Sequence, residues 1–142
     1  MMDLLSILQA SLVPAIMLSG AGLISLSLQS RYGRVIDRIR IFHYEILKKD
    51  KISKFAEQQL DILIRRGKLL RNSMFGVLLC ILFAVLTTIF LLINSIFNVF
   101  HSLVLIFFSI SLISLLMAML FAVIEIFISY DAVLKEDESL RS

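Results

Sequence analysis

Three predominantly apolar runs dominate the chain, and one polar segment separates the first two. The first run covers residues 4–28 and contains no charge, the second covers residues 74–93, and the third covers residues 100–128 with one charge, Glu125. A helix needs about 20 apolar residues to span a bilayer. The first run is longer than the apolar core of a cleaved signal peptide, and it lacks the basic start of one. We therefore predict three membrane-spanning helices.

The polar segment, residues 31–72, also has helical periodicity. Its first half repeats apolar residues at i, i+4, i+7 and i+11, on one helical face: Val35, Ile39, Phe42 and Ile46. The stretch KKDKISK at 48–54 is typical of a turn, and the second half again mixes apolar residues with helix formers. We predict a helical hairpin whose two arms extend the first and second spans, with a possible kink site at Gly33.

The predicted fold class is an all-α membrane protein with three transmembrane helices and a cytoplasmic helical hairpin between the first and second. Its segments are transmembrane helix 1 at 1–30, the basic hairpin at 31–72, transmembrane helix 2 at 73–94, a short outer turn at 95–99, transmembrane helix 3 at 100–130 and an acidic cytoplasmic tail at 131–142.

Composition and charge support a membrane location and set the orientation. Hydrophobic residues make up 59% of the chain and the mean hydropathy is +0.95, whereas soluble domains are roughly 45–50% apolar. Twelve of the 14 Lys and Arg residues lie between Arg31 and Arg71, and the other two follow the third span. The positive-inside rule then predicts a cytoplasmic hairpin, a cytoplasmic C-terminus and an outer N-terminus.

The basic hairpin has several possible partners. Contact with anionic lipid head groups, worth about 1 kcal/mol per base near the surface, is the interpretation we favour. An acidic protein partner, or a basic vestibule that concentrates anions, is the alternative. The aromatic residues of the segment form no stacking pattern, so we expect no nucleic acid to bind.

Each span carries one stripe of small or polar residues at helical spacing, where close helix packing is favoured in lipid. The stripes are Ser11, Ala15, Ser19 and Gly22; Ser73, Gly76, Cys80, Ala84 and Thr87; and Ser111, Ser114, Ala118 and Ala122, followed by Glu125. We favour packing within the chain, and the alternative is that some stripes line the pathway of an oligomer. Pro14 lies inside the first span, where it removes one backbone hydrogen bond.

The charged residues at the membrane edge form a candidate ionic network. Its members are Arg31, Arg34, Asp37, Arg38, Arg40 and Glu125. A carboxylate inside a span is costly and rarely faces lipid. We favour an ion pair between Glu125 and Arg31 or Arg34, with a cation or proton site as the alternative. Asp37 is the expected helix-surface partner of the neighbouring arginines.

The sequence contains no recognisable catalytic, nucleotide-binding or metal-binding motif. There is no paired-carboxylate, nucleotide-binding or metalloprotease motif, and no nucleophile lies beside a base. His43, His101 and Cys80 each lack ligand-spaced companions. We therefore predict no catalytic, cofactor-binding or metal-binding residues, and a protein that is not an enzyme.

The stretch LQASLVPAIMLSGAGLISLSLQSRYGRVIDRIR at 8–40 resembles the start of a bacterial family of small multi-span membrane proteins of unknown function. Similar proteins combine a span rich in Ala, Pro, Ser and Gly with an Arg/Asp block, which here comprises Ser30, Arg31, Val35, Asp37, Arg38 and Arg40. The resemblance implies the three-span architecture and a bacterial inner membrane. It supplies no activity, substrate or catalytic residue.

Two functions follow from these observations. The first is a non-enzymatic scaffold or accessory subunit that forms homo-oligomers or binds a membrane-protein partner through its small-residue faces. The second is a homo-oligomeric channel or small transporter with a pathway lined by transmembrane helix 1 or 3. Three spans are too few to enclose a pore in one chain, so a channel would need closed rotational symmetry.

Overall fold

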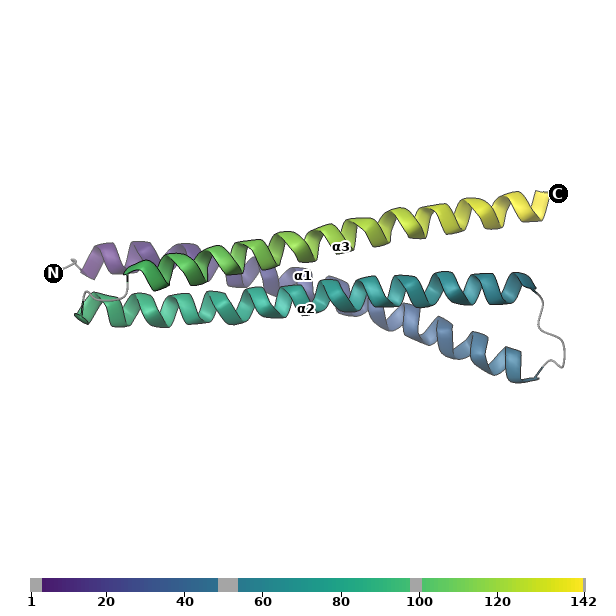
Figure 1. The fold of residues 1–142 in the computed structure, drawn as a ribbon, viewed down its shortest axis with the longest axis horizontal. Helices are drawn as coiled ribbons and strands as arrows, with labels where there is room; N and C mark the ends of the chain where they lie inside the picture. Colours follow the sequence, from purple (N-terminus) through teal and green to yellow (C-terminus); the bar gives the residue numbers. More distant parts are fainter. Residues whose placement is uncertain (1–3, 49–53, 98–100, 142) are drawn as a thin grey trace. The chain divides into compact units, whose positions relative to one another are not determined.

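The protein folds as three long α-helices. The computed structural model describes residues 4–48, 54–97 and 101–141, and all of them are helical. Helix α1 spans Leu4–Lys48, α2 spans Lys54–Phe97 and α3 spans His101–Arg141 (Figure 1). The all-helical prediction is confirmed for these residues. The predicted turn at 48–54 falls mostly outside the described residues. Of the predicted outer turn at 95–99, residues 95–97 are helical and belong to α2, and residues 98 and 99 lie outside the described residues.

Each helix is about twice as long as a bilayer requires. The helices contain 45, 44 and 41 residues. At 1.5 Å per residue they measure about 68, 66 and 62 Å, against a hydrocarbon core of about 30 Å. The helical segments Ser11–Tyr44, Gln58–Ser95 and Ser102–Ala132 each contain a stretch that is long and apolar enough to cross a membrane. The chain therefore carries three candidate membrane spans, one on each helix.

Helix α1 passes without a break through residue 30 and α2 through residue 72, so residues 31–48 and 54–72 continue the first two apolar runs as helices. Helix α2 ends at Phe97 rather than at 94. Helix α3 also continues through 131–141, which we predicted to be a separate acidic tail. That stretch contains no Gly or Pro and is rich in Ala, Leu, Glu and Lys. These residues favour helix, so nothing in the sequence ends α3 at residue 130.

The chain divides into two compact units. The apolar unit comprises Met1–Leu26 and Phe75–Ala118, and the basic unit comprises Ser27–Met74 and Met119–Ser142. All 14 Lys and Arg residues fall in the basic unit by sequence, and Asp3 is the single charged residue of the apolar unit. The helical parts of the apolar unit, 4–26, 75–97 and 101–118, are about 27–35 Å long at 1.5 Å per residue. That length matches the hydrocarbon core of one bilayer.

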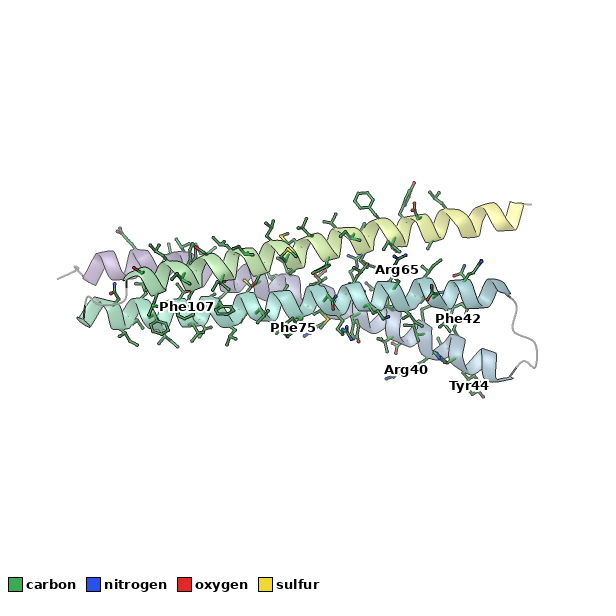
Figure 2. All side chains as sticks on the ribbon, viewed as in Figure 1. Arg40, Phe42, Tyr44, Arg65, Phe75 and Phe107 are labelled. Carbon is green, nitrogen blue, oxygen red and sulfur yellow. The ribbon has the colours of Figure 1, made fainter. Side chains whose placement is uncertain are left out.

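Small side chains allow α2 and α3 to approach closely in the apolar unit. A Cβ atom placed on Gly76 would lie 2.9 Å from the Cβ of Ala118 and 3.2 Å from the carbonyl oxygen of Ser114. Further along the same pair of helices, the ring of Phe107 stacks on Phe83 and Phe90, with centroid distances of 5.9 and 5.1 Å. Phe107 is labelled on α3 in Figure 2. Lipid provides no hydrophobic driving force for helix association, so the helices associate here through close van der Waals packing at glycine and alanine.

Buried positions recur every seven residues on all three helices. On α1 they include Pro14, Ala21, Leu28 and Val35, and on α3 they are Ser111, Ala118 and Glu125. Helix α2 has two such series, Leu63, Leu70, Val77 and Ala84, and Ser73, Cys80, Thr87 and Asn94. A seven-residue interval is typical of coiled-coil packing. The two series on α2 show that this helix packs against both of the others.

Part of the predicted packing stripe of the first span lies on the exposed side of α1 in the single chain. Ala15 and Ser19 are exposed, and a Cβ atom on Gly22 would meet nothing within 4 Å. The hydroxyl of Ser19 instead donates to the carbonyl of Ala15 in its own helix, at 3.3 Å. The buried face of α1 continues through Leu28 and Val35, which are large apolar residues. The predicted stripe leads toward Gln29 and Gly33, which offer no comparable apolar surface.

The stripes of the other two spans lie largely inside the chain. Ser73, Cys80, Ala84 and Thr87 are buried on α2, and Gly76 contacts α3. Ser111 and Ala118 are buried on α3, whereas Ser114 and Ala122 are half-buried. These two stripes therefore occupy packed faces of the single chain.

Candidate functional site: a buried carboxylate and an arginine pocket

The candidate site is built around Glu125, which is 0% exposed. Glu125 follows Ala118 by seven residues and Ser111 by fourteen, so it lies on the one buried stripe of α3. An ionised carboxylate taken out of water without partners is strongly unfavourable. Positive groups that reach Glu125 from the neighbouring helices would offset this cost.

Two arginines, one from each neighbouring helix, reach this carboxylate within the basic unit. From α2, the Arg66 Nε donates to Glu125 Oε1 at 3.0 Å, and its Nη2 lies 3.0 Å from the same oxygen. From α1, the Arg31 Nη2 lies 2.9 Å from Oε2. The side chains of Arg31 and Arg66 are 30% and 21% exposed. One carboxylate therefore joins three helices. Glu125, Arg31 and Arg66 form a triad whose net charge is +1.

The two arms of the triad are not equivalent. Arg66 makes a directional hydrogen bond to Oε1, and such charge-assisted bonds are the strong ones. Oε2 is within ion-pair distance of Arg31 but receives no hydrogen bond from any residue that the structure describes. Arg66 is therefore the firmly fixed partner, and Arg31 has donors free to engage a second acceptor.

The triad forms part of the wall of a pocket of about 390 Å³ in the basic unit. Four arginines line this arginine pocket, namely Arg31, Arg34, Arg38 and Arg66, together with Glu125 and Gln59. The remaining wall is apolar and consists of Val35, Phe42, Ile62, Leu63 and Ala132. Four positive charges and one negative charge leave a net charge of +3 around the pocket.

Arg34 and Arg38 contribute most of this uncompensated charge. Both are exposed, and neither forms an ion pair with any carboxylate whose side chain the structure describes. Asp37, the expected partner, is itself exposed and pairs with no described arginine. It directly precedes Arg38, so those two side chains leave the helix about 100° apart. Arg34 and Arg40 lie three residues from Asp37, a spacing that allows contact, but neither pairs with it. The part of the predicted network around Asp37 is therefore not assembled.

Arg40 lies outside both the triad and the pocket. It is exposed, does not line the pocket, and projects outward from α1, as does Tyr44 (Figure 2). Of the six residues predicted as an ionic network, the structure brings Arg31 and Glu125 into contact and places Arg34 and Arg38 on the same pocket wall. Asp37 and Arg40 stand apart.

Arg66 is the site residue that the sequence analysis missed. Arg66 follows Leu63 by three residues and precedes Leu70 by four, so it shares the phase of the buried positions on α2. A basic residue in phase with a buried apolar series is a signal that it faces a neighbouring helix. That signal was present in the sequence.

The apolar unit holds a smaller pocket of about 220 Å³ beside Pro14. Its lining is apolar except for Thr87, whose hydroxyl already donates to the carbonyl of Phe83 at 2.7 Å. Without a further polar group to replace the hydration shell of an ion, this pocket does not resemble an ion pathway.

Metal-binding geometry does not occur within the described ranges. No group of three or more His, Cys, Asp and Glu side chains gathers there. The Nδ1 of His43 hydrogen bonds to the carbonyl of Ile39 at 3.1 Å, within α1. The side chain of His101 lies outside the described residues. Cys80 is a buried free thiol.

Comparison with known proteins yields one family match. No curated protein and no solved structure matches the chain. Residues 11–134 match a family described as Protein of unknown function (DUF2721). The match takes in the three candidate spans completely, together with Arg31, Arg66 and Glu125. It agrees with the resemblance drawn from residues 8–40 to a family of unknown function. The chain therefore belongs to the DUF2721 family.

Proposed function

We propose that this protein is a non-enzymatic integral membrane scaffold or accessory subunit of the bacterial inner membrane. The observation that carries the proposal is the contact of Glu125 with Arg31 and Arg66. The one carboxylate of the third apolar run joins three helices of the same chain. Its role is then to hold the bundle together at the membrane edge.

The charge of the triad supports this role over cation transport. A carboxylate that passes cations or protons would need to exchange its partners during each passage. Glu125 is instead held by two arginines, and the local charge of +1 repels cations. The proposed scaffold therefore uses its most polar intramembrane group for cohesion.

In the proposed orientation, the basic unit lies at the cytoplasmic surface. Its described part exposes a set of basic side chains: Arg34, Arg38, Arg40, Arg65, Lys68 and Arg71. Anionic lipids of the cytoplasmic leaflet attract such groups by about 1 kcal/mol each. The arms of α1 and α2 would then form the cytoplasmic hairpin, with the N-terminus outside and the C-terminus inside.

The exposed face of α1 supports association with another membrane helix. Ala15 and Ser19 are exposed and Gly22 has open space around it, so another helix could approach α1 closely here. A second copy of the chain or a different membrane protein would fit this face. The same face also supports the second candidate function, a homo-oligomeric channel, because Ser19 carries an exposed hydroxyl that could line a pathway.

Native mass spectrometry of the protein, extracted from its own host in mild detergent, tests the proposal. Masses that include a second polypeptide would support an accessory subunit. A single mass at a multiple of 16.2 kDa, trimeric or larger, would indicate a closed homo-oligomer. Ion flux into liposomes that contain the protein is then measured against empty liposomes. A scaffold should give no flux above the empty liposomes, whereas a channel should give flux above them. Flux that disappears in Glu125→Gln would overturn the scaffold proposal.

A further inference from the structure

The arginine pocket carries more positive charge than the fold itself uses. Glu125 contacts both the Nε and the Nη2 of Arg66, but only the Nη2 of Arg31. Arg34 and Arg38 line the same pocket without a carboxylate partner among the described residues. Like charges gathered at one site repel one another. An anion in the pocket would relieve that repulsion.

The donors of the pocket suit a phosphate group. A guanidinium presents its donors in a planar fork that matches two phosphate oxygens at once. Arg31, Arg34 and Arg38 occupy successive turns of α1, three and four residues apart, so they lie on one face of the helix. The volume of about 390 Å³ falls within the usual range for small-molecule sites.

The opposite wall of the pocket indicates where the phosphate comes from. Val35, Phe42 and Leu63 contribute apolar surface beside the arginines. A free phosphate ion gains nothing from such a wall, whereas an amphiphile places its apolar part against it. The wall therefore favours a phosphate carried by a phospholipid head group over inorganic phosphate.

We propose that the arginine pocket is a specific site for one phosphate group, held by Arg31, Arg34 and Arg38. This inference deepens the lipid contact in the proposed function, and rests on it for the presence of lipid at the basic unit. It differs from a diffuse basic surface because it requires particular arginines. Arg38 lines the pocket and Arg40 does not, although both are exposed on α1.

The test compares the wild type with Arg38→Gln and the matched control Arg40→Gln. Each protein is placed in nanodiscs of phosphatidylcholine with a minor fraction of phosphatidylglycerol, and retained phosphatidylglycerol is counted by native mass spectrometry. Arg38→Gln should reduce the apparent affinity roughly tenfold or more, because a charge-assisted hydrogen bond is lost. Arg40→Gln should retain the lipid as the wild type does. Arg34→Gln is a second pocket variant, and the melting temperature of each protein verifies its fold.

A second arm identifies the source of the phosphate. Inorganic phosphate is titrated into protein in pure phosphatidylcholine nanodiscs, with chloride at equal ionic strength as the reference. Saturable phosphate binding that Arg38→Gln abolishes, without selective lipid retention, would support the site with free phosphate as its ligand. Lipid retention without phosphate binding would support a head-group site.

Two results would overturn the inference, and they bear differently on the proposed function. Equal lipid retention in Arg38→Gln and Arg40→Gln, with no phosphate binding, would refute the pocket but leave lipid contact by the basic surface intact. A wild type that retains no phosphatidylglycerol and binds no phosphate would refute the pocket and also the lipid contact. The scaffold role would still stand on its own test of mass and flux.

Discussion

The hydroxyl of Ser111 donates a hydrogen bond to the main-chain carbonyl oxygen of Cys80 at 2.8 Å. Both residues are fully buried, and the Cys80 Sγ lies 3.5 Å from the same hydroxyl. The bond crosses from α3 to α2 and reaches a carbonyl that lies inside a helix. A side chain can reach such a carbonyl only where the two helices approach closely, as they do one turn away at Gly76.

Replacing Ser111 by Ala should destabilise the protein modestly. The change removes the donor to Cys80 and leaves a small gap, so we expect a loss of about 0.5–1.5 kcal/mol. Ser109→Ala is the matched control, because Ser109 is exposed and its hydroxyl donates to Leu105 in its own helix at 2.8 Å. Thermal unfolding in detergent measures both. Equal melting temperatures for the two variants would contradict the importance of the bond between helices.

Gly76→Ala should be more damaging than the same change at any of the other four glycines. The added methyl group would lie 2.9 Å from the Cβ of Ala118 and 3.2 Å from a backbone oxygen, so α2 and α3 must separate. Overpacking of this kind costs about 1–3 kcal/mol. Gly20→Ala is the control, since its methyl group meets nothing within 4 Å. It should be neutral or stabilise α1 by up to about 1 kcal/mol through helix propensity.

Arg66→Gln should destabilise the basic unit, whereas Arg65→Gln should not. Both substitutions remove one positive charge at adjacent positions, but only Arg66 contacts Glu125. Breaking a buried ion pair costs about 3–5 kcal/mol. Arg66 is 21% exposed, so we expect roughly 2–3 kcal/mol after solvent screening. Chemical unfolding in detergent, followed by circular dichroism, gives the free energies for both variants.

Glu125→Gln and Arg31→Gln test the same triad from its other two members. Glu125→Gln should have the larger effect, because it leaves two arginines facing each other without a carboxylate. Arg31→Gln should have the smaller effect, since Arg31 is 30% exposed and gives Oε2 no directional hydrogen bond. If both variants kept the wild-type melting temperature and assembly state, the triad would have no structural role.

The lone thiol should report unfolding without any engineering. Cys80 is the only cysteine in the sequence and is fully buried. A maleimide dye should therefore react slowly with the folded protein and rapidly once α2 and α3 separate. The rate in mild detergent is compared with the rate in denaturant. Rapid labelling of the folded protein would contradict the packing of Cys80 against Ser111.

The orientation can be tested with a cysteine in the basic unit. In a Cys80→Ala background, Arg40→Cys places a thiol on an exposed position of α1. A membrane-impermeant maleimide should label this thiol in inverted membrane vesicles but not in intact cells, because the positive-inside rule places the basic unit in the cytoplasm. Labelling in intact cells would reverse the proposed orientation.

Most of the helical architecture followed from the apolar runs alone. Runs of 20 or more apolar residues admit few alternatives to a helix, because lipid cannot satisfy exposed backbone groups. The helix ends were harder to place. No Gly or Pro marks the boundary at residue 130, so the change from apolar to charged residues was taken as the end of the third span. Helix α3 continues through this position because local propensity, not polarity, determines where a helix ends.

The candidate site was only partly predictable. Burial of Glu125 followed from its phase with Ala118, but its second partner lies 59 residues away along the chain. Arg66 is one of twelve bases between residues 31 and 71, and charge alone does not distinguish it from Arg65. On α1, the spacing of small residues pointed to the face of Ala15 and Ser19, whereas the buried face carries Ala21, Leu28 and Val35. Small size alone did not indicate which face packs within the chain.

The seven-residue recurrence of buried positions restricts how these helices can change in length. Inserting one residue into α2 between Gly76 and Cys80 would rotate the following part by about 100° relative to the preceding part. Gly76 could then face Ala118 only if the carbonyl of Cys80 turned away from Ser111. Adding seven residues at once to both helices of this pair would restore the facing of the two contacts. Natural length variation within the helices of this family should therefore occur in whole multiples of seven.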